Sequence, residues 1–219
     1  MTISRSKDYI FTEKDGRLEF VGNFDGYYRD HADPWGQSAT EEMSGYYRRA
    51  RERLLAIIGQ CPYHSSILEV GCGLGYVCEQ IRCRFPDSQV FGLDISPVAV
   101  EKARALFPHI LFSTGNIATP NLLTQSYDVI ILNQLLWYIL HTMDAVLDNC
   151  RVHLSSNGRL IIANGFLRNQ RYGNDVMENY DGAFRYLSQC PGLKIVHSAF
   201  DNDDEEHFDA SFVLTLTAN

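Results

Sequence analysis

Three alternate glycines, Gly71, Gly73 and Gly75, lie between two carboxylates, Glu69 and Asp94. Glycines in this arrangement allow a backbone turn to adopt positive φ and to approach a ligand closely, because no Cβ intervenes. Asp94 follows the last glycine by roughly 20 residues, which is the offset of an acid that accepts hydrogen bonds from the hydroxyls of a ribose. The pattern therefore predicts a site for an adenosine-bearing ligand beside the N-terminus of a helix.

The spacing of these glycines indicates which adenosine compound binds. Dinucleotide sites use G-x-G-x-x-G, which makes room for a pyrophosphate, whereas residues 69–75 of this chain read E-V-G-C-G-L-G. An acid ahead of the first glycine repels a pyrophosphate but suits a ligand that carries an ammonium and a sulfonium group. A nicotinamide dehydrogenase is therefore a distant alternative.

Residues 69–75 resemble the first signature of class I S-adenosylmethionine (SAM) methyltransferases, and residues 92–96 (G-L-D-I-S) resemble the second. Residues 113–117 are similar to the loop after the third strand of that family, and residues 127–134 are similar to its fourth strand and active-site end. The resemblance covers residues 40–165 well and the rest loosely. Motifs that follow one another in the family's order are far more specific than a single glycine motif.

The resemblance implies that SAM is the cofactor and S-adenosylhomocysteine (SAH) the product. It assigns the ribose to Asp94, the adenine to Asn116 and Ile117, and the methionine ammonium group to Asn133. Glu69 either faces the ligand or orients the loop. The cofactor-binding residues expected in full are Glu69, Gly71, Cys72, Gly73, Gly75, Asp94, Ile95, Asn116, Ile117 and Asn133.

The residues after the fourth expected strand are predicted to line the reaction cavity. Amino-methyltransferases that act on nucleic acids and proteins often have (Asp/Asn)-Pro-Pro-(aromatic) here, whereas residues 133–137 read N-Q-L-L-W, without prolines. This difference argues against a nucleobase amine as the methyl acceptor.

The tripeptide Asp33-Pro34-Trp35, ahead of an aromatic-containing helix, resembles the small-molecule subgroup that includes nodulation N-methyltransferases acting on an amino sugar. That resemblance implies that the N-terminal segment covers SAM; the alternative is a surface loop packed on the domain. Arg168 and Arg171 either bind an acidic group of the acceptor or pair with nearby acids. The acceptor-binding residues expected in full are Trp35, Tyr46, Gln134, Trp137, Tyr138, Arg168 and Arg171.

Methyl transfer from a sulfonium is an in-line displacement, so positioning and exclusion of water are the main tasks of the protein. An amine acceptor must lose a proton before it attacks, and His31 and His141 are the candidate bases, each with a structural role as its alternative. A hydroxyl acceptor needs a stronger base or a metal, and no metal-binding cluster is evident in the sequence; residues 201–206 are acidic but lack the spacing of a calcium loop. N-methylation of a small molecule is expected, with O-methylation of a hydroxyl or carboxylate as the alternative.

Two alternatives keep the SAM site but change the activity. One is a SAM-binding protein without transferase activity. The other is an aminopropyl transferase, which usually carries additional acids where this chain has Asn133 and Gln134.

The elements that position these residues follow from the alternation of apolar runs and turns. Strands are expected near residues 66–70, 89–93, 110–113, 127–132, 158–164, 193–200 and 208–217, and helices near 25–31, 41–58, 75–84, 97–106, 141–153 and 175–188. The resulting fold class is α/β, a Rossmann-like seven-stranded methyltransferase sheet, mostly parallel with an antiparallel C-terminal hairpin, helices on both faces and an irregular N-terminal cap. Residues 1–39 form the cap or lid, and residues 40–219 form the SAM-dependent methyltransferase domain.

Composition narrows the class of partner. The net charge of −8 argues against a nucleic-acid partner, and no apolar run is long enough to span a bilayer. No basic-apolar signal segment is present at the N-terminus, so a cytoplasmic protein without a membrane partner is expected. The six cysteines are expected to be reduced and buried. The sequence does not indicate the oligomeric state.

Overall fold

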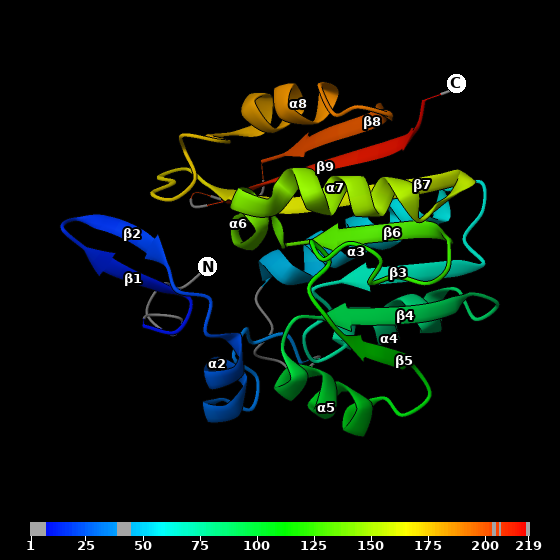
Figure 1. Cartoon of the computed structure of the whole chain (residues 1–219), viewed down its shortest axis with the longest axis horizontal. Helices are drawn as coiled ribbons and strands as arrows, with labels where there is room; N and C mark the ends of the chain where they lie inside the picture. Colours follow the sequence, from blue (N-terminus) through cyan, green and yellow to red (C-terminus); the bar gives the residue numbers. More distant parts are fainter. Residues whose placement is uncertain (1–7, 39–44, 203–204, 206, 218–219) are drawn as a thin grey trace.

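The structure, a computed structural model, describes residues 8–38, 45–202, 205 and 207–217. Its main sheet has seven strands in the order β5-β4-β3-β6-β7-β9-β8 (Figure 1). Strands β3 to β7 run parallel, and β9 is antiparallel to both of its neighbours. The strands are β3 (Ser66–Val70), β4 (Gln89–Asp94), β5 (Leu111–Thr114), β6 (Tyr127–Asn133), β7 (Leu154–Leu167), β8 (Leu193–Asp201) and β9 (His207–Leu216). The predicted fold class is confirmed.

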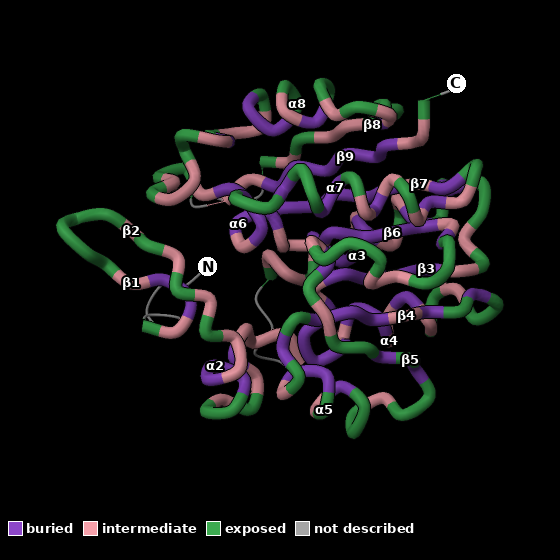
Figure 2. Tube along the Cα trace, in the orientation of Figure 1, coloured by how far each residue is buried: buried purple, intermediate pink, exposed green. Residues whose placement is uncertain are grey.

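Helices cover both faces of the sheet, because alternate residues of a strand point to opposite sides. Ile130 and Leu132 of β6 belong to the core under α6 (Leu136–Ile139), α7 (Met143–Val152) and α8 (Tyr180–Ser188). Val129 and Ile131 belong to the core under α3 (Gly45–Gly59), α4 (Tyr76–Arg84) and α5 (Pro97–Leu106). The central strands are therefore mostly apolar and buried, and Figure 2 shows this burial along the middle of the sheet.

The helix after β4 begins as the sequence predicts. The Ser96 hydroxyl accepts a hydrogen bond of 3.2 Å from the Ala99 amide, and Pro97 occupies the first turn. A serine cap followed by proline favours a helix start at this point, since proline needs no amide partner there. This cap orients the turn that carries Asp94 and Ile95.

The N-terminal segment contains a β-hairpin that the sequence analysis missed. Strands β1 (Phe11–Lys14) and β2 (Arg17–Phe20) pair antiparallel through Asp15 and Gly16, whose φ angles are 51° and 76°. An Asp-Gly pair with two positive φ angles is a two-residue hairpin turn, so the signal was present in the sequence. The predicted short helix is confirmed as α2 (Phe24–Asp30). In Figure 1 the hairpin and α2 lie beside the carboxyl ends of the parallel strands.

Two boundaries differ from those predicted. Strand β7 begins at Leu154 rather than near residue 158, so Asn157 lies inside this strand; the pairing with β6 shifts register there. Helix α8 begins at Tyr180 rather than at residue 175, because Asn179 caps it through a 3.0 Å bond from the Gly182 amide. Residues 41–44 of the first long predicted helix lie outside the described residues.

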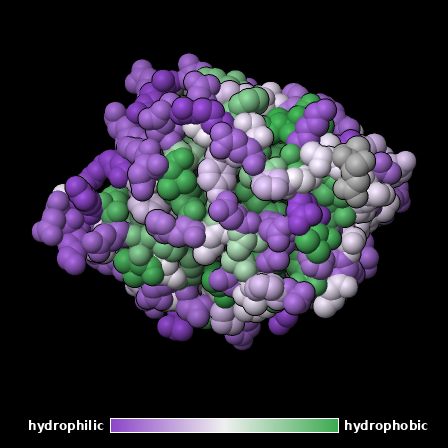
Figure 3. All heavy atoms as spheres, turned by 45° about the horizontal axis from the view of Figure 1, so that its top comes forward, coloured by the Kyte–Doolittle hydropathy of each residue, from purple (hydrophilic) through white to green (hydrophobic). Residues whose placement is uncertain are grey.

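The prediction that every cysteine is buried is wrong for two of them. Cys83 is exposed at the end of α4 and Cys190 is half-buried, whereas the remaining four are buried and all six thiols are free. None of the described helices is long and apolar enough to cross a membrane. On the face in Figure 3, hydrophobic and hydrophilic side chains are interspersed in small patches.

Candidate cofactor and acceptor site

The turn between β3 and α4 requires glycine at all three predicted positions. The φ angles of Gly71, Gly73 and Gly75 are 72°, 52° and 81°, in the left-handed region that favours glycine. Space is also short, since a Cβ on Gly71 would lie 2.6 Å from Leu135 and one on Gly73 would lie 2.5 Å from the Tyr28 hydroxyl. The backbone of this loop therefore forms part of a cavity wall that no larger residue could form.

Asp94 is the last residue of β4, and its side chain holds this loop through a hydrogen bond. One carboxylate oxygen accepts a 2.8 Å bond from the Gly73 amide, and the other accepts a 2.9 Å bond from the Ser96 amide. Burial raises the pKa of Asp94, and the two backbone bonds act in the opposite direction. Each oxygen retains a second lone pair, so the carboxylate can still accept bonds from a ligand's hydroxyl groups.

Glu69 lies behind the glycine loop. Its side chain accepts a 2.9 Å bond from the thiol of Cys78 on α4, and only 3% of its surface is exposed. Burial raises the pKa of Glu69 to about 7, while the nearby Arg51 guanidinium opposes that shift. This geometry favours the alternative in which Glu69 orients the loop.

A cavity of about 410 Å³ opens where the parallel strands end, and it brings together most of the predicted site. Every expected cofactor residue lines this cavity except Gly75. Of the expected acceptor residues, all line it except Arg168, so the lining includes Trp35, Tyr46, Gln134, Trp137, Tyr138 and Arg171. Segments far apart in the chain thus meet in one hollow.

Three predicted residues lie elsewhere. Arg168 is exposed and donates a hydrogen bond to the Asn202 side chain. The His31 ring packs edge-on against Tyr27 at 5.0 Å, and His141 is exposed, with its Nε2 3.3 Å from the Tyr172 hydroxyl. Neither histidine lines the cavity.

The loops after β5 and β6 carry the remaining residues that are expected to bind the cofactor. Asn116 is exposed. Its side-chain oxygen accepts a 2.9 Å hydrogen bond from the Ala118 amide, which leaves the side-chain NH₂ group available. Ile117 is buried beside it. Gln134 directly follows Asn133 with φ of 56°, an uncommon conformation for a non-glycine residue. Its side-chain oxygen accepts a 3.0 Å bond from the Gly165 amide, which holds the turn in place.

We call the part of the cavity that the expected acceptor-binding residues line the acceptor end. A polar cluster that the sequence analysis did not find borders it. The Tyr46 hydroxyl donates a 3.0 Å bond to Asp209, whose other oxygen is 3.2 Å from the Arg53 guanidinium. The His207 ring stacks on Tyr46 with centroids 4.9 Å apart and lines the cavity. Tyr46 and Asp209 are 163 positions apart, so no local pattern could have joined them.

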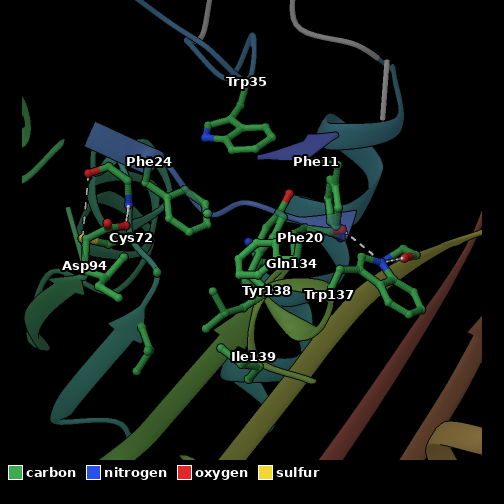
Figure 4. A pocket seen from close by; sticks show the side chains of 18 of the residues that line it. Phe11, Phe20, Phe24, Trp35, Cys72, Asp94, Gln134, Trp137, Tyr138 and Ile139 are labelled. Carbon is green, nitrogen blue, oxygen red and sulfur yellow. Dashed lines mark hydrogen bonds between the residues drawn. The ribbon is translucent and has the colours of Figure 1, made fainter. Parts of the chain in front are cut away.

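Aromatic rings form the outer wall of the acceptor end. Phe11, Phe20, Phe24 and Trp35 pack around Tyr138 of α6 with centroid distances of 6.1, 6.2, 5.4 and 5.8 Å (Figure 4). The two hairpin residues and Phe24 were missed, because their position depends on how the N-terminal segment folds back over the sheet.

Comparisons with known proteins also indicate a methyltransferase domain. Residues 68–160 match a family model described as a methyltransferase domain. The chain is 32% identical over 130 residues to malonyl-[acyl-carrier protein] O-methyltransferase of Bacillus cereus. The matched region covers 58% of this chain and 45% of that protein. It is 29% identical over 162 residues to ribosomal RNA small subunit methyltransferase C of Pseudomonas syringae, covering 69% and 46%. The chain thus spans less than half the length of these curated relatives.

Solved structures share the fold. N-methyltransferase NodS from Bradyrhizobium japonicum in complex with SAH superposes with a TM-score of 0.62 at 19% identity, covering 86% of this chain and 98% of that one. A TehB-like SAM-dependent methyltransferase from Corynebacterium glutamicum gives a TM-score of 0.61 at 21% identity, covering 88% and 99%. Residues 68–160 thus belong to a methyltransferase domain, and the chain has the fold of S-adenosylmethionine-dependent methyltransferases.

Proposed function

We propose that the chain binds SAM in this cavity and transfers its methyl group to a small-molecule amine. One observation carries the proposal. The glycine loop, Asp94, the Asn116 loop and Asn133 line a single cavity, which the expected acceptor-binding residues also line. The ends of neighbouring parallel strands are where open α/β sheets bind ligands. The glycine wall and the ribose-binding acid fit an adenosine compound, and the two carboxylates that line the cavity fit a cationic one.

Each cofactor residue has a task that follows from its position. Asp94 accepts hydrogen bonds from the ribose hydroxyls with the lone pairs that its backbone bonds leave unused. Asn116 meets the adenine edge, and Ile117 packs on the ring. The Asn133 end of β6 receives the methionine ammonium group. Glu69 keeps the loop in position from behind.

The reacting end is arranged for positioning rather than for covalent catalysis. Bound SAM supplies an electrophilic methyl group on a sulfonium. Tyr138, Trp35 and Trp137 exclude water from the acceptor and orient it, and such orientation is a large part of the catalytic effect for an in-line displacement. His207 is the histidine that lines the described cavity, and it accepts the proton that an ammonium group must lose before its nitrogen attacks.

A carboxylate acceptor is the second candidate. The names of two groups of relatives describe enzymes acting on malonyl-[acyl-carrier protein] and on trans-aconitate, both of which carry carboxylates. Against this candidate, Arg171 is the lone lysine or arginine in the described lining, and it is ion-paired with Glu13 at 3.0 Å. A buried carboxylate without a free cationic partner is costly.

One experiment tests the activity and the class of acceptor together. Purified protein is incubated with methyl-labelled SAM and a cell extract that has been separated into a low-mass filtrate and a macromolecular fraction. We expect the label in a filtrate compound that is positively charged at neutral pH. Label in RNA or protein would replace the small-molecule proposal, and SAM binding without any turnover would favour the non-catalytic alternative.

A further inference from the structure

We propose that the acceptor end of the cavity is an aromatic cage that binds an ammonium group, so that the acceptor enters as an organic cation. The aromatic cage consists of Phe11, Phe20, Phe24, Trp35 and Tyr138. This inference deepens the proposed function by naming the charge and chemical class of the acceptor. The transfer step rests on the proposed function, whereas cation binding by the cage does not.

The first argument is the number and origin of the rings. Two come from the β1–β2 hairpin, one from α2, one from the loop after α2 and one from α6, and all line the same cavity. Their orientations differ: Phe24 meets Tyr138 edge-on at 85°, whereas Phe20 lies nearly parallel to it at 30°. Figure 4 shows Trp35, Phe24 and Phe11 approaching Tyr138 from different sides. Aromatic faces around one space are the arrangement that recognises ammonium groups.

The second argument is that contacts within the protein hold the cage rings together. The Trp35 indole nitrogen donates a 3.0 Å bond to the Tyr28 hydroxyl, which in turn lies against the glycine loop at Gly73. Phe11 also contacts Tyr172 with ring centroids 4.9 Å apart. These contacts connect the cage rings to the cofactor loop, so a ligand in the cage would lie beside the bound cofactor.

The third argument is the charge of the lining. The charged or titratable side chains other than phenols and thiols that line the described cavity are Glu69, Asp94, Arg171 and His207. Arg171, the one permanent cation among them, is neutralised by Glu13 of the hairpin. Asp209, a buried carboxylate behind Tyr46, is paired with Arg53 and adds no net charge. Two carboxyl groups line the described cavity and its one arginine is ion-paired, and the net charge of the chain is −8, so a cation is favoured over an anion.

The reaction balances with such an acceptor. The ammonium group loses one proton to His207, and the freed lone pair on nitrogen forms the new bond to the methyl carbon. The bond between sulfur and that carbon breaks, and its electron pair stays on sulfur to give SAH. The product nitrogen again carries a positive charge, so the cage binds the acceptor before proton loss and the product after transfer.

The test uses three probes of nearly the same shape and different charge. Tetramethylammonium, tert-butanol and trimethylacetate each give one methyl singlet in the proton NMR spectrum, whose broadening on added protein reports binding. With the protein saturated by SAH, we expect tetramethylammonium to bind about tenfold more tightly than tert-butanol and trimethylacetate to bind weakest. Equal binding of the first two would make the cage an ordinary apolar pocket, and tighter binding of trimethylacetate would make it an anion site.

Variants of Tyr138 test whether tetramethylammonium binds in the cage. Tyr138→Leu removes a ring and should lower tetramethylammonium affinity about tenfold, whereas Tyr138→Phe keeps the ring and should preserve it. Phe184→Leu, which changes an exposed aromatic residue on α8, is the matched control. Unchanged affinity in a folded Tyr138→Leu protein would overturn the cage. SAH affinity of the wild-type protein separates the two proposals: absence of SAH binding refutes the cofactor site, whereas SAH binding without binding of tetramethylammonium refutes the cage alone.

Discussion

At the residue scale, the site depends on side chains that serve the backbone and the ligand together. Asp94 is the clearest case, because its two oxygens tie the glycine loop to the turn before α5 and still face the cavity. A carboxylate held by two amides cannot rotate away, so its unused lone pairs point in fixed directions. Asp94 therefore holds the loop, and we propose that it also binds the ribose.

Asp94→Ala should weaken SAM and SAH binding by roughly 10- to 150-fold, because hydrogen bonds to a charged group contribute about 1.5–3 kcal/mol. Isothermal titration calorimetry measures both affinities. Asp87→Ala is the control, since Asp87 is exposed before the start of β4. Affinity within a factor of two of the wild type would remove Asp94 from the ribose site.

His207 differs from the two histidines predicted from the sequence, because it alone of the three lines the described cavity. If it accepts the proton of the acceptor, His207→Gln should lower the initial rate with the low-mass filtrate by about 100-fold or more and leave SAH affinity unchanged. His141→Gln should retain the wild-type rate. Equal rates for both variants would show that solvent removes the proton.

At the scale of elements, the β1–β2 hairpin contributes part of the wall of the cavity. Phe11 and Phe20 pack on Tyr138, and Glu13 pairs with Arg171. An exposed ion pair of this kind contributes about 1 kcal/mol or less, so the rings provide most of the attachment. We therefore propose that the N-terminal segment is a lid whose closure depends on what the cavity contains.

SAH should protect residues 25–50 from trypsin, because a filled cavity gives the lid more surface to pack on. Arg29 and Arg48 are exposed cleavage sites within this range, and Arg84 at the end of α4 is an internal control that should be cut equally in both states. Mass spectrometry of timed digests gives the rates. Identical cleavage at Arg29 with and without SAH would make the segment a passive extension.

At the scale of the whole molecule, stability is linked to the site through Glu69, whose side chain is buried between β3 and α4. Its pKa is raised to about 7 by burial, above the value of an exposed glutamate, so the folded state binds its proton more tightly than the unfolded state does. The stabilising contribution of the protonated form is complete below the unfolded pKa. It is lost as pH rises through the folded pKa.

Glu69→Gln should remove this dependence, because the amide keeps the shape of the protonated acid. Between pH 5 and pH 8 the free energy of unfolding of the wild type should fall relative to that of the variant by on the order of 3 kcal/mol. Urea denaturation of both proteins at the two pH values measures the difference. A constant difference across that range would mean that Glu69 is ionised throughout in the folded protein.

Most of the main sheet was predictable because its signals are local. Apolar runs such as residues 127–132, the Ser96-Pro97 cap and the alternate glycines each specify a strand, a helix start or a turn within a few residues. The start of β7 was not predicted because it depends on pairing: β7 reaches back to Leu154, with which Tyr127 pairs. The hairpin at Asp15-Gly16 had a local signal that went unused.

The sequence by itself determined the sheet, the glycine loop and the acid at the end of the second parallel strand, because each rests on contacts between near neighbours or on one repeated strand–helix unit. Only the tertiary structure decided the acceptor end. Tyr46, Asp209 and His207 come from opposite ends of the chain, and the cage rings reach Tyr138 only when the N-terminal hairpin folds over the strand ends. Long-range packing, which leaves no local pattern, therefore sets which acceptor fits.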